Sequence, residues 1–275
     1  MDALQLFRDG SLQEAIAACT REVQSHPGQP DHRDLLSQLL CFTGELERAD
    51  KHLEILGTQF PDRAPVVSLI RQLIRASKAR QQFYDEGRVP EFTETPPVYL
   101  QHYLQASICF RQGEADEAAR LLTSAEALRP QLAGRCNGQQ FQDLRDADDL
   151  TAAFLEIFTT TGKYYWIPLE NIRRIMLHPI ESPLDVLWRR CQIQATACSE
   201  GIVYVPQLYA GTFRAEDESL RLGRGTEWFG PDEGPVRGIG HRIFWIDDTT
   251  RPFVEIQNLE IEEVIKPAEE SSPQA

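Results

Sequence analysis

The densest group of residues that could do chemistry is an acidic cluster near the middle of the chain. It holds four aspartates: Asp143, Asp146, Asp148 and Asp149. Carboxylate oxygens bind hard divalent cations, but a calcium loop also needs a central glycine and a bidentate glutamate in register, and this segment has neither. Aspartates also form turns and caps by accepting hydrogen bonds from nearby backbone N–H groups. The sequence therefore favours turn-forming aspartates and predicts no metal.

Other candidates for catalysis or cofactor binding match no complete motif. The segment Arg221–Thr226 could cradle a phosphate, but its spacing is not that of a phosphate loop, and Gly238–Gly240 is too short for a dinucleotide-binding fingerprint. His178 or His241 could be a general base, yet neither accompanies a nucleophile motif. The six histidines are scattered and no cysteine pair has the CxxC spacing. We therefore expect neither enzyme activity nor a cofactor.

Charge and hydropathy exclude two further classes of partner. The 275 residues carry a net charge of −14, which opposes nucleic-acid binding, because that needs a basic surface to displace counterions. No apolar run approaches the roughly 18 residues that span a bilayer, so no membrane partner is expected. Residues 1–5 lack the basic and apolar regions of a signal peptide, and we expect a cytoplasmic protein without disulfides. Three cysteines fall on apolar helical faces and should be buried: Cys19, Cys41 and Cys109.

The elements that would position a site in the first half are helical repeats. Glycine, alanine and proline recur at offsets of 0, 5 and 17 in three places: Gly10–Ala15–Pro27, Gly44–Ala49–Pro61 and Gly113–Ala118–Pro130. The first two glycines lie 34 residues apart, which is the tetratricopeptide repeat length. Glycine suits a turn with positive φ, alanine allows paired helices to pack closely, and proline ends a helix. This pattern predicts helical pairs of a kind that often bind other proteins.

Two further details concern the start of one helix and the middle of the repeat region. Ser11 with Glu14 matches a capping box at a helix start. The copy expected between Pro61 and Tyr99 is degenerate, and its pattern predicts one long helix from Pro65 to about Gly87. The repeat region is therefore expected to be interrupted in its middle.

The pattern becomes β-like in the second half. We expect a helical domain over residues 1–130, an ordered acidic junction over 131–149, an antiparallel β-rich domain over 150–266 and a disordered tail over 267–275. The local predictions are a hairpin of strands 153–158 and 163–167, a strand over 202–205, a hairpin of strands 242–246 and 253–256, and a short helix from 182 to about 190. The fold class is thus α+β, with tetratricopeptide-like repeats followed by a mostly antiparallel β domain with short helices.

Sequence blocks spread over nearly the whole chain carry a family resemblance. They are Arg33–Leu40 before Gly44–Ala49, Gly134–Phe141, Asp146–Asp148, Gly162–Pro168, Asp185–Trp188, Val205–Tyr209, Leu222–Trp228 and Gly238–Arg242. On these blocks the chain resembles the ImpE/TagJ (SciE-type) family, the accessory proteins of bacterial type VI secretion. Two positions depart from the expected pattern, because Glu227 stands where aspartate is expected and His241 where glutamine is expected.

The resemblance implies a non-enzymatic, cytoplasmic role in virulence-associated secretion. Members of the family are thought to bind the small subunit of the contractile sheath through that subunit's N-terminal helical region. They are thereby linked to the AAA+ ATPase that recycles contracted sheaths. The resemblance transfers no catalytic residues.

The repeats suggest where such a helix would bind. In a tetratricopeptide array the first helix of each pair lines the concave groove, and aromatic anchors suit an amphipathic helix laid in it. With Gly44 and Gly113 as the turns, the groove candidates are Asp34, Gln38, Phe42, Tyr103, Ser107, Phe110 and Arg111. Alternatively, Phe42 and Phe110 pack against the β half.

A different function class remains open at this point. The chain could be a regulatory module that binds a small ligand or metal between the helical and β halves, where pockets often form. The segments Asp146–Asp148 and Arg221–Arg224 could face one another there. A bound metabolite or metal would favour this alternative, and measurable turnover would favour a hydrolase.

Overall fold

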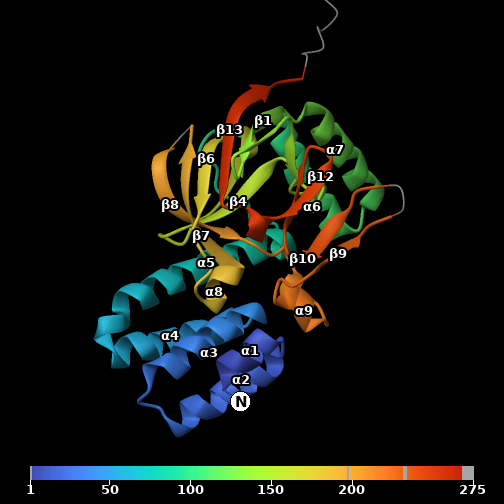
Figure 1. The fold of residues 1–275 in the computed structure, drawn as a ribbon. Coiled ribbons are helices and arrows are strands. Elements are labelled where there is room, and N and C mark those ends of the chain that lie inside the picture. The colour runs from blue at the N-terminus through green and yellow to red at the C-terminus, as the bar shows by residue number, and fades with distance from the viewer. Residues whose placement is uncertain (1, 197, 232–233, 268–275) are drawn as a thin grey trace, which may run out of the picture.

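The computed structural model describes residues 2–196, 198–231 and 234–267, and combines an α-helical half with an antiparallel β half (Figure 1). The longer helices are α1 (Ala3–Asp9), α2 (Leu12–Ser25), α3 (Pro30–Phe42), α4 (Leu46–Gln59), α5 (Ala64–Glu86), α6 (Val98–Gln112) and α7 (Ala115–Leu128). Two short helices, α8 (Pro183–Leu187) and α9 (Glu218–Arg221), lie among the strands. The predicted α+β class is confirmed.

The three repeated glycines form the turns that their spacing predicts. Gly10, Gly44 and Gly113 have φ angles of 99°, 72° and 78°, in the left-handed region that favours glycine. The repeated alanines Ala15, Ala49 and Ala118 are all fully buried. The prolines Pro27, Pro61 and Pro130 each come two residues after a helix end. The local geometry of the helical pairs α1–α2, α3–α4 and α6–α7 is therefore confirmed.

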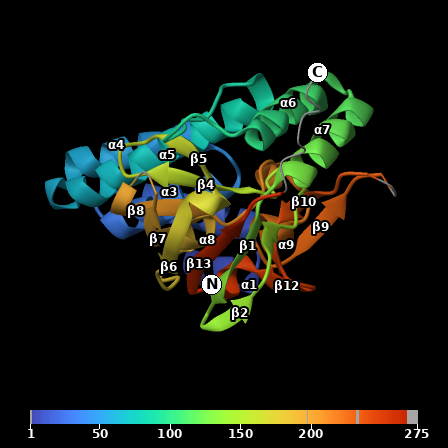
Figure 2. The ribbon, with the colours of Figure 1, turned by 90° about the horizontal axis from the view of Figure 1, so that it is seen from above.

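The degenerate copy forms the long single helix α5, as expected. It has 23 residues, about 35 Å at 1.5 Å per residue, and ends at Gly87, whose φ is 85°. Helix α5 crosses the molecule between the α1–α4 group and the α6–α7 pair (Figure 1). Figure 2 shows α4 to α7 along one side of the molecule, next to β4 (Phe154–Thr159) and β5 (Tyr164–Pro168). The helical region is thus interrupted in its middle.

The β half is built on a sheet with strand order β2-β1-β13-β6-β7-β8-β4-β5. The bounds of its other strands are β1 (Gln131–Cys136), β2 (Gln139–Phe141), β6 (Ile172–Leu177), β7 (Trp188–Ala195), β8 (Cys198–Pro206) and β13 (Asn258–Ile265). Every neighbouring pair is antiparallel. The edge strand β5 is partly covered, because the Glu91 N–H donates to the Tyr164 carbonyl at 2.9 Å and the Glu91 carbonyl accepts from Trp166 at 3.1 Å.

Two smaller sheets complete this half. One has the order β12-β11-β3, from β3 (Leu144–Asp146), β11 (Ile243–Ile246) and β12 (Thr249–Pro252), and the other pairs β9 (Thr226–Phe229) with β10 (Arg237–Gly240). Residues 131–149, which the sequence presents as an acidic junction, supply strands to both the large sheet and the three-stranded sheet. Most of the expected tail, from residue 268 on, lies outside the described residues.

Two local predictions are corrected. Residues 253–256 do not form a strand: Phe253–Glu255 is a 3₁₀ turn, and the hairpin partner of β11 is β12. The cause is local hydrogen bonding, because the Val254 N–H donates to His241 Nε2 at 3.0 Å and the Ile256 N–H to the Phe253 carbonyl. The predicted hairpin at Gly162, the strand over 202–205 and the short helix α8 are confirmed.

The second correction concerns the start of α2. The Ser11 side chain makes no capping bond to the described part of the chain. Instead, the Glu218 carboxylate of α9 accepts from the backbone N–H groups of Leu12 and Gln13 at 2.8 and 2.9 Å. A distant glutamate thus replaces the predicted local cap.

The core has two parts, one on each side of the large sheet. One joins the helices to β4, β5 and β8, and contains the three predicted buried cysteines, Cys19, Cys41 and Cys109. The other lies among the strands of the β half. Trp166 and Trp188 are buried, whereas Trp228 and Trp245 are each 41% exposed. None of the described helices is long and apolar enough to cross a membrane.

Candidate functional site

The structure does not bring the seven predicted groove residues into one groove. Asp34, Gln38 and Phe42 lie on α3, which packs against α2, α4 and α8. Tyr103, Ser107, Phe110 and Arg111 lie on α6, which packs chiefly on α7. Helices α3 and α6 lie on different sides of α5 (Figure 1). The single groove expected from a regular repeat is therefore wrong, because α5 separates the two pairs.

Two of the three predicted aromatic anchors are core residues. Phe42 and Tyr103 are each only 1% exposed. Phe42 packs edge-on against Phe7 of α1, with ring centroids 5.3 Å apart, and Tyr103 packs against Phe154 of β4 at 5.8 Å. Such rings hold the helices to each other and to the sheet. They present no open surface to a partner.

The other predicted groove residues are also engaged within the chain. Ser107 is buried and donates to the Leu104 carbonyl at 2.6 Å. Phe110 is half-buried beneath the Arg237 guanidinium, 5.3 Å from its ring centroid, so it does pack against the β half. Arg111 donates to the Phe83 carbonyl at 3.1 Å, near the C-terminal end of α5, where a cation is favourable. Asp34 and Gln38 are half-buried, and burial raises the pKa of Asp34.

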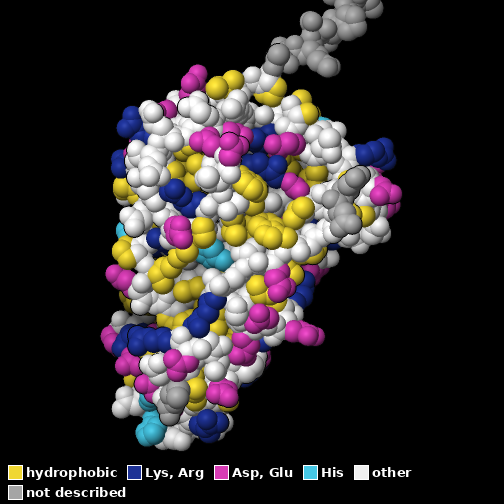
Figure 3. All heavy atoms as spheres, turned by 45° about the vertical axis from the view of Figure 1, so that its right-hand side comes forward, with side chains coloured by type: hydrophobic (Ala, Val, Ile, Leu, Met, Phe, Trp, Pro, Cys, Tyr) yellow, Lys and Arg dark blue, Asp and Glu magenta, His cyan; other side chains and the backbone are white. Residues whose placement is uncertain are grey.

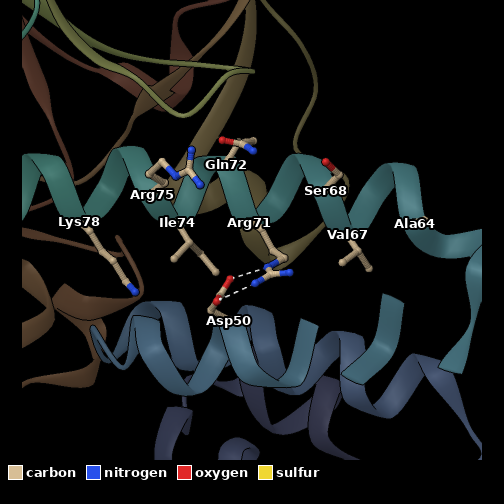
Figure 4. Close-up of a pocket in the computed structure, with 9 residues that line it drawn as sticks. All are labelled: Asp50, Ala64, Val67, Ser68, Arg71, Gln72, Ile74, Arg75 and Lys78. Carbon is tan, nitrogen blue, oxygen red and sulfur yellow. Dashed lines mark hydrogen bonds and ion pairs between the residues drawn. The ribbon is translucent and has the colours of Figure 1, made fainter. Parts of the chain in front are cut away.

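The groove that the helical half does offer runs along α5 beside α4 (Figure 4). Its volume is about 480 Å³, and its lining consists of Asp50, Ala64, Val67, Ser68, Arg71, Gln72, Ile74, Arg75 and Lys78. All of these except Asp50 come from α5, and they fall on neighbouring helical turns. Val67 and Ile74 point toward α4 and are buried, so the groove presents little apolar surface. Arg75 and Ser68 are exposed along it.

Charged side chains line this groove on two sides. Figure 4 shows Arg71 and Lys78 pointing toward α4 and Arg75 pointing to the opposite side of α5. Arg71 holds Asp50 with two bonds, Nε–Oδ1 at 2.8 Å and Nη2–Oδ2 at 3.1 Å, and this contact raises the pKa of Arg71. Lys78 Nζ lies 2.9 Å from Glu47 Oε1, and its hydrogen bond lowers the pKa of Glu47. Arg75 forms no ion pair with any described residue.

A second exposed surface lies on the β half. Figure 3 looks onto the side that carries β9, β10 and β12, where apolar side chains gather. A cleft of about 380 Å³ is lined there by Trp228, Val236, Ile243 and Trp245, with Arg145 and Asp149 beside them. Phe229 next to it is 51% exposed. This surface was not predicted from the sequence.

The acidic cluster is not an open metal site, because arginines already hold its carboxylates. Asp143 pairs with Arg129 at 2.6 Å, Asp148 with Arg237 at 2.8 Å, Asp146 with Arg242 at 3.4 Å, and Asp149 with Arg145. The turn prediction is confirmed, since Asp146 accepts from the Asp148 N–H and Asp148 from the Leu150 N–H. Over the described residues, no three His, Cys, Asp or Glu side chains are grouped so as to hold a metal.

A buried charged network joins the two halves. Glu156 of β4 is fully buried and accepts two bonds from Arg80 of α5, at 2.8 and 2.6 Å, and a further bond from Arg242. Tyr164 and Tyr84 also donate to it, at 2.6 and 3.1 Å. Burial opposes ionisation of Glu156, but Arg80 and Arg242 outweigh it and lower its pKa to about 2. A glutamate inside an otherwise apolar strand was the sequence signal for this network, and it was overlooked.

The segments Asp146–Asp148 and Arg221–Arg224, which were expected to face one another at a small-ligand site between the halves, do not do so. Arg221 pairs with Glu218 at 3.7 Å, and Arg224 donates to the carbonyls of Phe7 and Arg8 at 3.0 and 2.6 Å. Neither reaches the aspartates. A cavity between the described parts of the two halves, beside Arg80 and Phe213, measures about 60 Å³, which is room for a few waters. A metabolite does not fit in it.

The candidate general base His241 is a core residue as well. It is 6% exposed, and its Nε2 accepts the Val254 N–H. Burial, with help from Arg242 and Arg189, lowers its pKa to about 4. A neutral acceptor in this position stabilises the turn at Phe253–Glu255. His241 is therefore not placed for acid–base chemistry on a bound substrate.

Comparisons with known proteins agree with the sequence blocks that carry the resemblance. The family model described as ImpE protein matches residues 138–260. The chain is 28% identical to the type VI secretion system accessory component TagJ of Pseudomonas aeruginosa, over 95% of this chain and 92% of that protein. The crystal structure of protein VPA1032 from Vibrio parahaemolyticus matches with a TM-score of 0.89 and 25% identity, over 95% of this chain and 97% of that one. These matches support the resemblance of the chain to the ImpE/TagJ family.

Proposed function

We propose that this protein is a non-enzymatic accessory component of a bacterial type VI secretion system and acts in the cytoplasm. The observation that carries the proposal is its similarity to TagJ over 95% of its length, because no large part of either protein is left unmatched. The absence of an assembled catalytic group among the described residues is in keeping with a binding role. The aspartates of the acidic cluster form ion pairs with arginines, and the buried His241 accepts a backbone hydrogen bond, so these residues stabilise the fold.

We further propose the partner and its binding mode. The protein binds the small subunit of the contractile sheath through that subunit's N-terminal helix, and so links the sheath to the AAA+ ATPase that recycles it. The helical half supports this mode, because paired helices of this kind commonly bind segments of other proteins, and the groove beside α4 and α5 is open to solvent. An amphipathic helix is a common ligand of grooves between helices.

A co-purification experiment tests the partner. The protein is mixed with the sheath small subunit, either whole or lacking its N-terminal helix, and the complex is measured by size-exclusion chromatography and calorimetric titration. We expect a complex with the whole subunit and none with the truncated one. Addition of the ATPase should give a ternary complex. Equal binding of whole and truncated subunits would contradict the proposed mode, and no binding of either would contradict the partner.

A further inference from the structure

Strand β10 shows which backbone groups join it to β9. The Gly238 N–H donates away from β9, to Asp148 Oδ2 at 3.0 Å, and the Gly240 N–H likewise donates to Thr212 Oγ1 at 2.9 Å. The backbone groups of successive residues in an antiparallel strand point alternately to its two sides. The N–H and C=O groups of Ile239, which lies between these glycines, therefore point to β9.

The same alternation leaves the other edge of β9 open. Glu227 lies opposite Ile239 and forms the hydrogen-bonded pair with it, so the N–H and C=O groups of Thr226 and Trp228 point to the outer edge of β9. None of these four backbone groups is bonded to a described residue. Figures 1 and 2 both show the β9–β10 pair at the margin of the molecule. An open strand edge of this kind is a template for pairing with a further strand.

Aromatic side chains flank this open edge on both faces. Side chains alternate between the two faces of a strand, so Trp228 lies on one face of β9 and Phe229 on the other. Trp228 is 41% exposed, although its ring packs on Tyr209 with the centroids 5.7 Å apart, and Phe229 is 51% exposed. Exposed aromatic residues beside unpaired backbone groups favour a partner that covers both.

We infer that the outer edge of β9 binds an extended segment of a partner protein as an added antiparallel strand, with a lysine or arginine opposite Glu227 and apolar residues opposite Trp228 and Phe229. A basic residue is favoured, because opposite charges on facing residues stabilise a strand pair and the whole chain carries a net charge of −14. This inference goes beyond the proposed function, because it assigns a contact to the β half and takes a strand, not a helix, as the ligand.

A second copy of the chain is a poorer occupant of this edge. Antiparallel self-pairing through Thr226 and Trp228 sets the Glu227 side chain directly opposite its own copy. Like charges on facing residues destabilise a strand pair. The charge that favours a basic partner strand therefore opposes a homodimer at this edge.

Three soluble peptides of about nine residues, built of threonine and valine, test the ligand on the full chain. The first has a central lysine and the second a central glutamate. The third is the lysine peptide with the two residues beside the lysine N-methylated, which removes the donors that would face Thr226 and Trp228. Fluorescence anisotropy of labelled peptides gives the dissociation constants. We expect the lysine peptide to bind about three- to tenfold more tightly than the glutamate peptide at low salt, and about tenfold more tightly than the N-methylated peptide.

Matched variants locate the binding. Trp228→Ala removes the ring and keeps the edge N–H, whereas Trp228→Pro removes both and spares the bonds to β10, because that N–H faces outward. The alanine variant should weaken the lysine peptide about threefold, and the proline variant about tenfold. Glu227→Lys should reverse the preference, so that the glutamate peptide binds more tightly. Trp245→Ala is the control, since Trp245 is also 41% exposed but lies on β11. Thermal unfolding checks that each variant is folded.

The outcomes separate the strand edge from its alternatives. Reversal of the peptide preference in Glu227→Lys, with unchanged binding in Trp245→Ala, supports the inference. Equal binding of the lysine peptide and its N-methylated form, or no binding of any peptide, would overturn it. A loss in Trp245→Ala as large as that in Trp228→Ala would place the peptide in the tryptophan cleft and overturn the strand pairing. Self-association of the chain that Trp228→Pro abolishes would make a second copy the occupant and also overturn the inference.

Discussion

Helical pairs α3–α4 and α6–α7 share a sequence pattern but meet the rest of the molecule differently. Both turn at a glycine with positive φ and both bury the alanine five residues later. The α3–α4 turn lies against an aromatic ring of the β half, since a Cβ at Gly44 would come within 2.4 Å of Phe213. A Cβ at Gly113 would meet no atom of the described residues within 4 Å. The repeat thus determines the backbone conformation of the glycine. The neighbouring side chains determine how much a substitution of that glycine destabilises the protein.

The contacts that hold these helical pairs to the β half also differ in kind. The α1–α4 group is held by residues of the segment that follows β8: Phe213 at a turn, and Glu218 and Arg224 at helix ends. The α6–α7 pair is held by Tyr103 against β4 and by the ion pair of Arg129 with Asp143. The packing of Phe213 in the first set of contacts should not change with pH, whereas the Asp143 carboxylate should make part of the second set sensitive to acid.

The largest expected effect is the difference between two matched glycine substitutions. Gly44→Val should lower the free energy of unfolding by about 2–4 kcal/mol, because it adds a clash with Phe213 to the strain of positive φ. Gly113→Val should cost about 1–3 kcal/mol, from strain alone. Urea unfolding of both variants measures the difference. Equal losses would show that Phe213 yields without cost and that the surroundings of the two turns do not matter.

Features set by neighbouring residues were predictable from the sequence, and features set by distant contacts were not. The glycine turns, the Gly162 hairpin and α8 depend on a few adjacent residues. The predicted groove depended on where α3 and α6 lie, and the long helix α5 separates them. Local rules therefore identified the helical pairs but placed their aromatic side chains on a surface that the fold buries.

The same contrast applies to the polar residues of the candidate sites. Asp146 and Asp148 of the acidic cluster were correctly predicted as turn formers, because each accepts from the N–H group two residues further on. Their arginine partners come from distant segments and could not be found by spacing. The cap of α2 by Glu218 was missed for the same reason, since Ser11 offered a plausible local cap.

A smaller loss of stability should follow when the acid-sensitive ion pair between Arg129, at the end of α7, and Asp143 is removed. Burial opposes ionisation of Asp143, but its bonds with Arg129 outweigh it and lower the pKa of Asp143. A lowered pKa means that the ionised pair stabilises the fold above about pH 4, and that this contribution is lost as pH falls through the folded-state pKa. Asp143→Asn should therefore cost about 1–3 kcal/mol at pH 7 and less as the pH falls below 4.

Urea unfolding of wild type and Asp143→Asn across this pH range measures that loss. Gly44→Val is the internal comparison, because its penalty is steric and should not change with pH. A constant penalty for Asp143→Asn down to the acid limit of the folded protein would show that the Arg129 pair contributes nothing as a charge pair.

The smallest expected effect concerns the remote cap of α2. Glu218→Ala removes an acceptor from the first two N–H groups of that helix, where an anion is also favoured by the helix dipole. The expected loss is about 1 kcal/mol, with reduced hydrogen-exchange protection in α1 and α2 and unchanged protection in α6 and α7. Glu216→Ala is the control, since it removes a nearby exposed carboxylate that caps no described helix. Equal exchange in the two variants would mean that water replaces Glu218 at no cost and that the contacts of Phe213 and Arg224 suffice to hold the α1–α4 group to the β half.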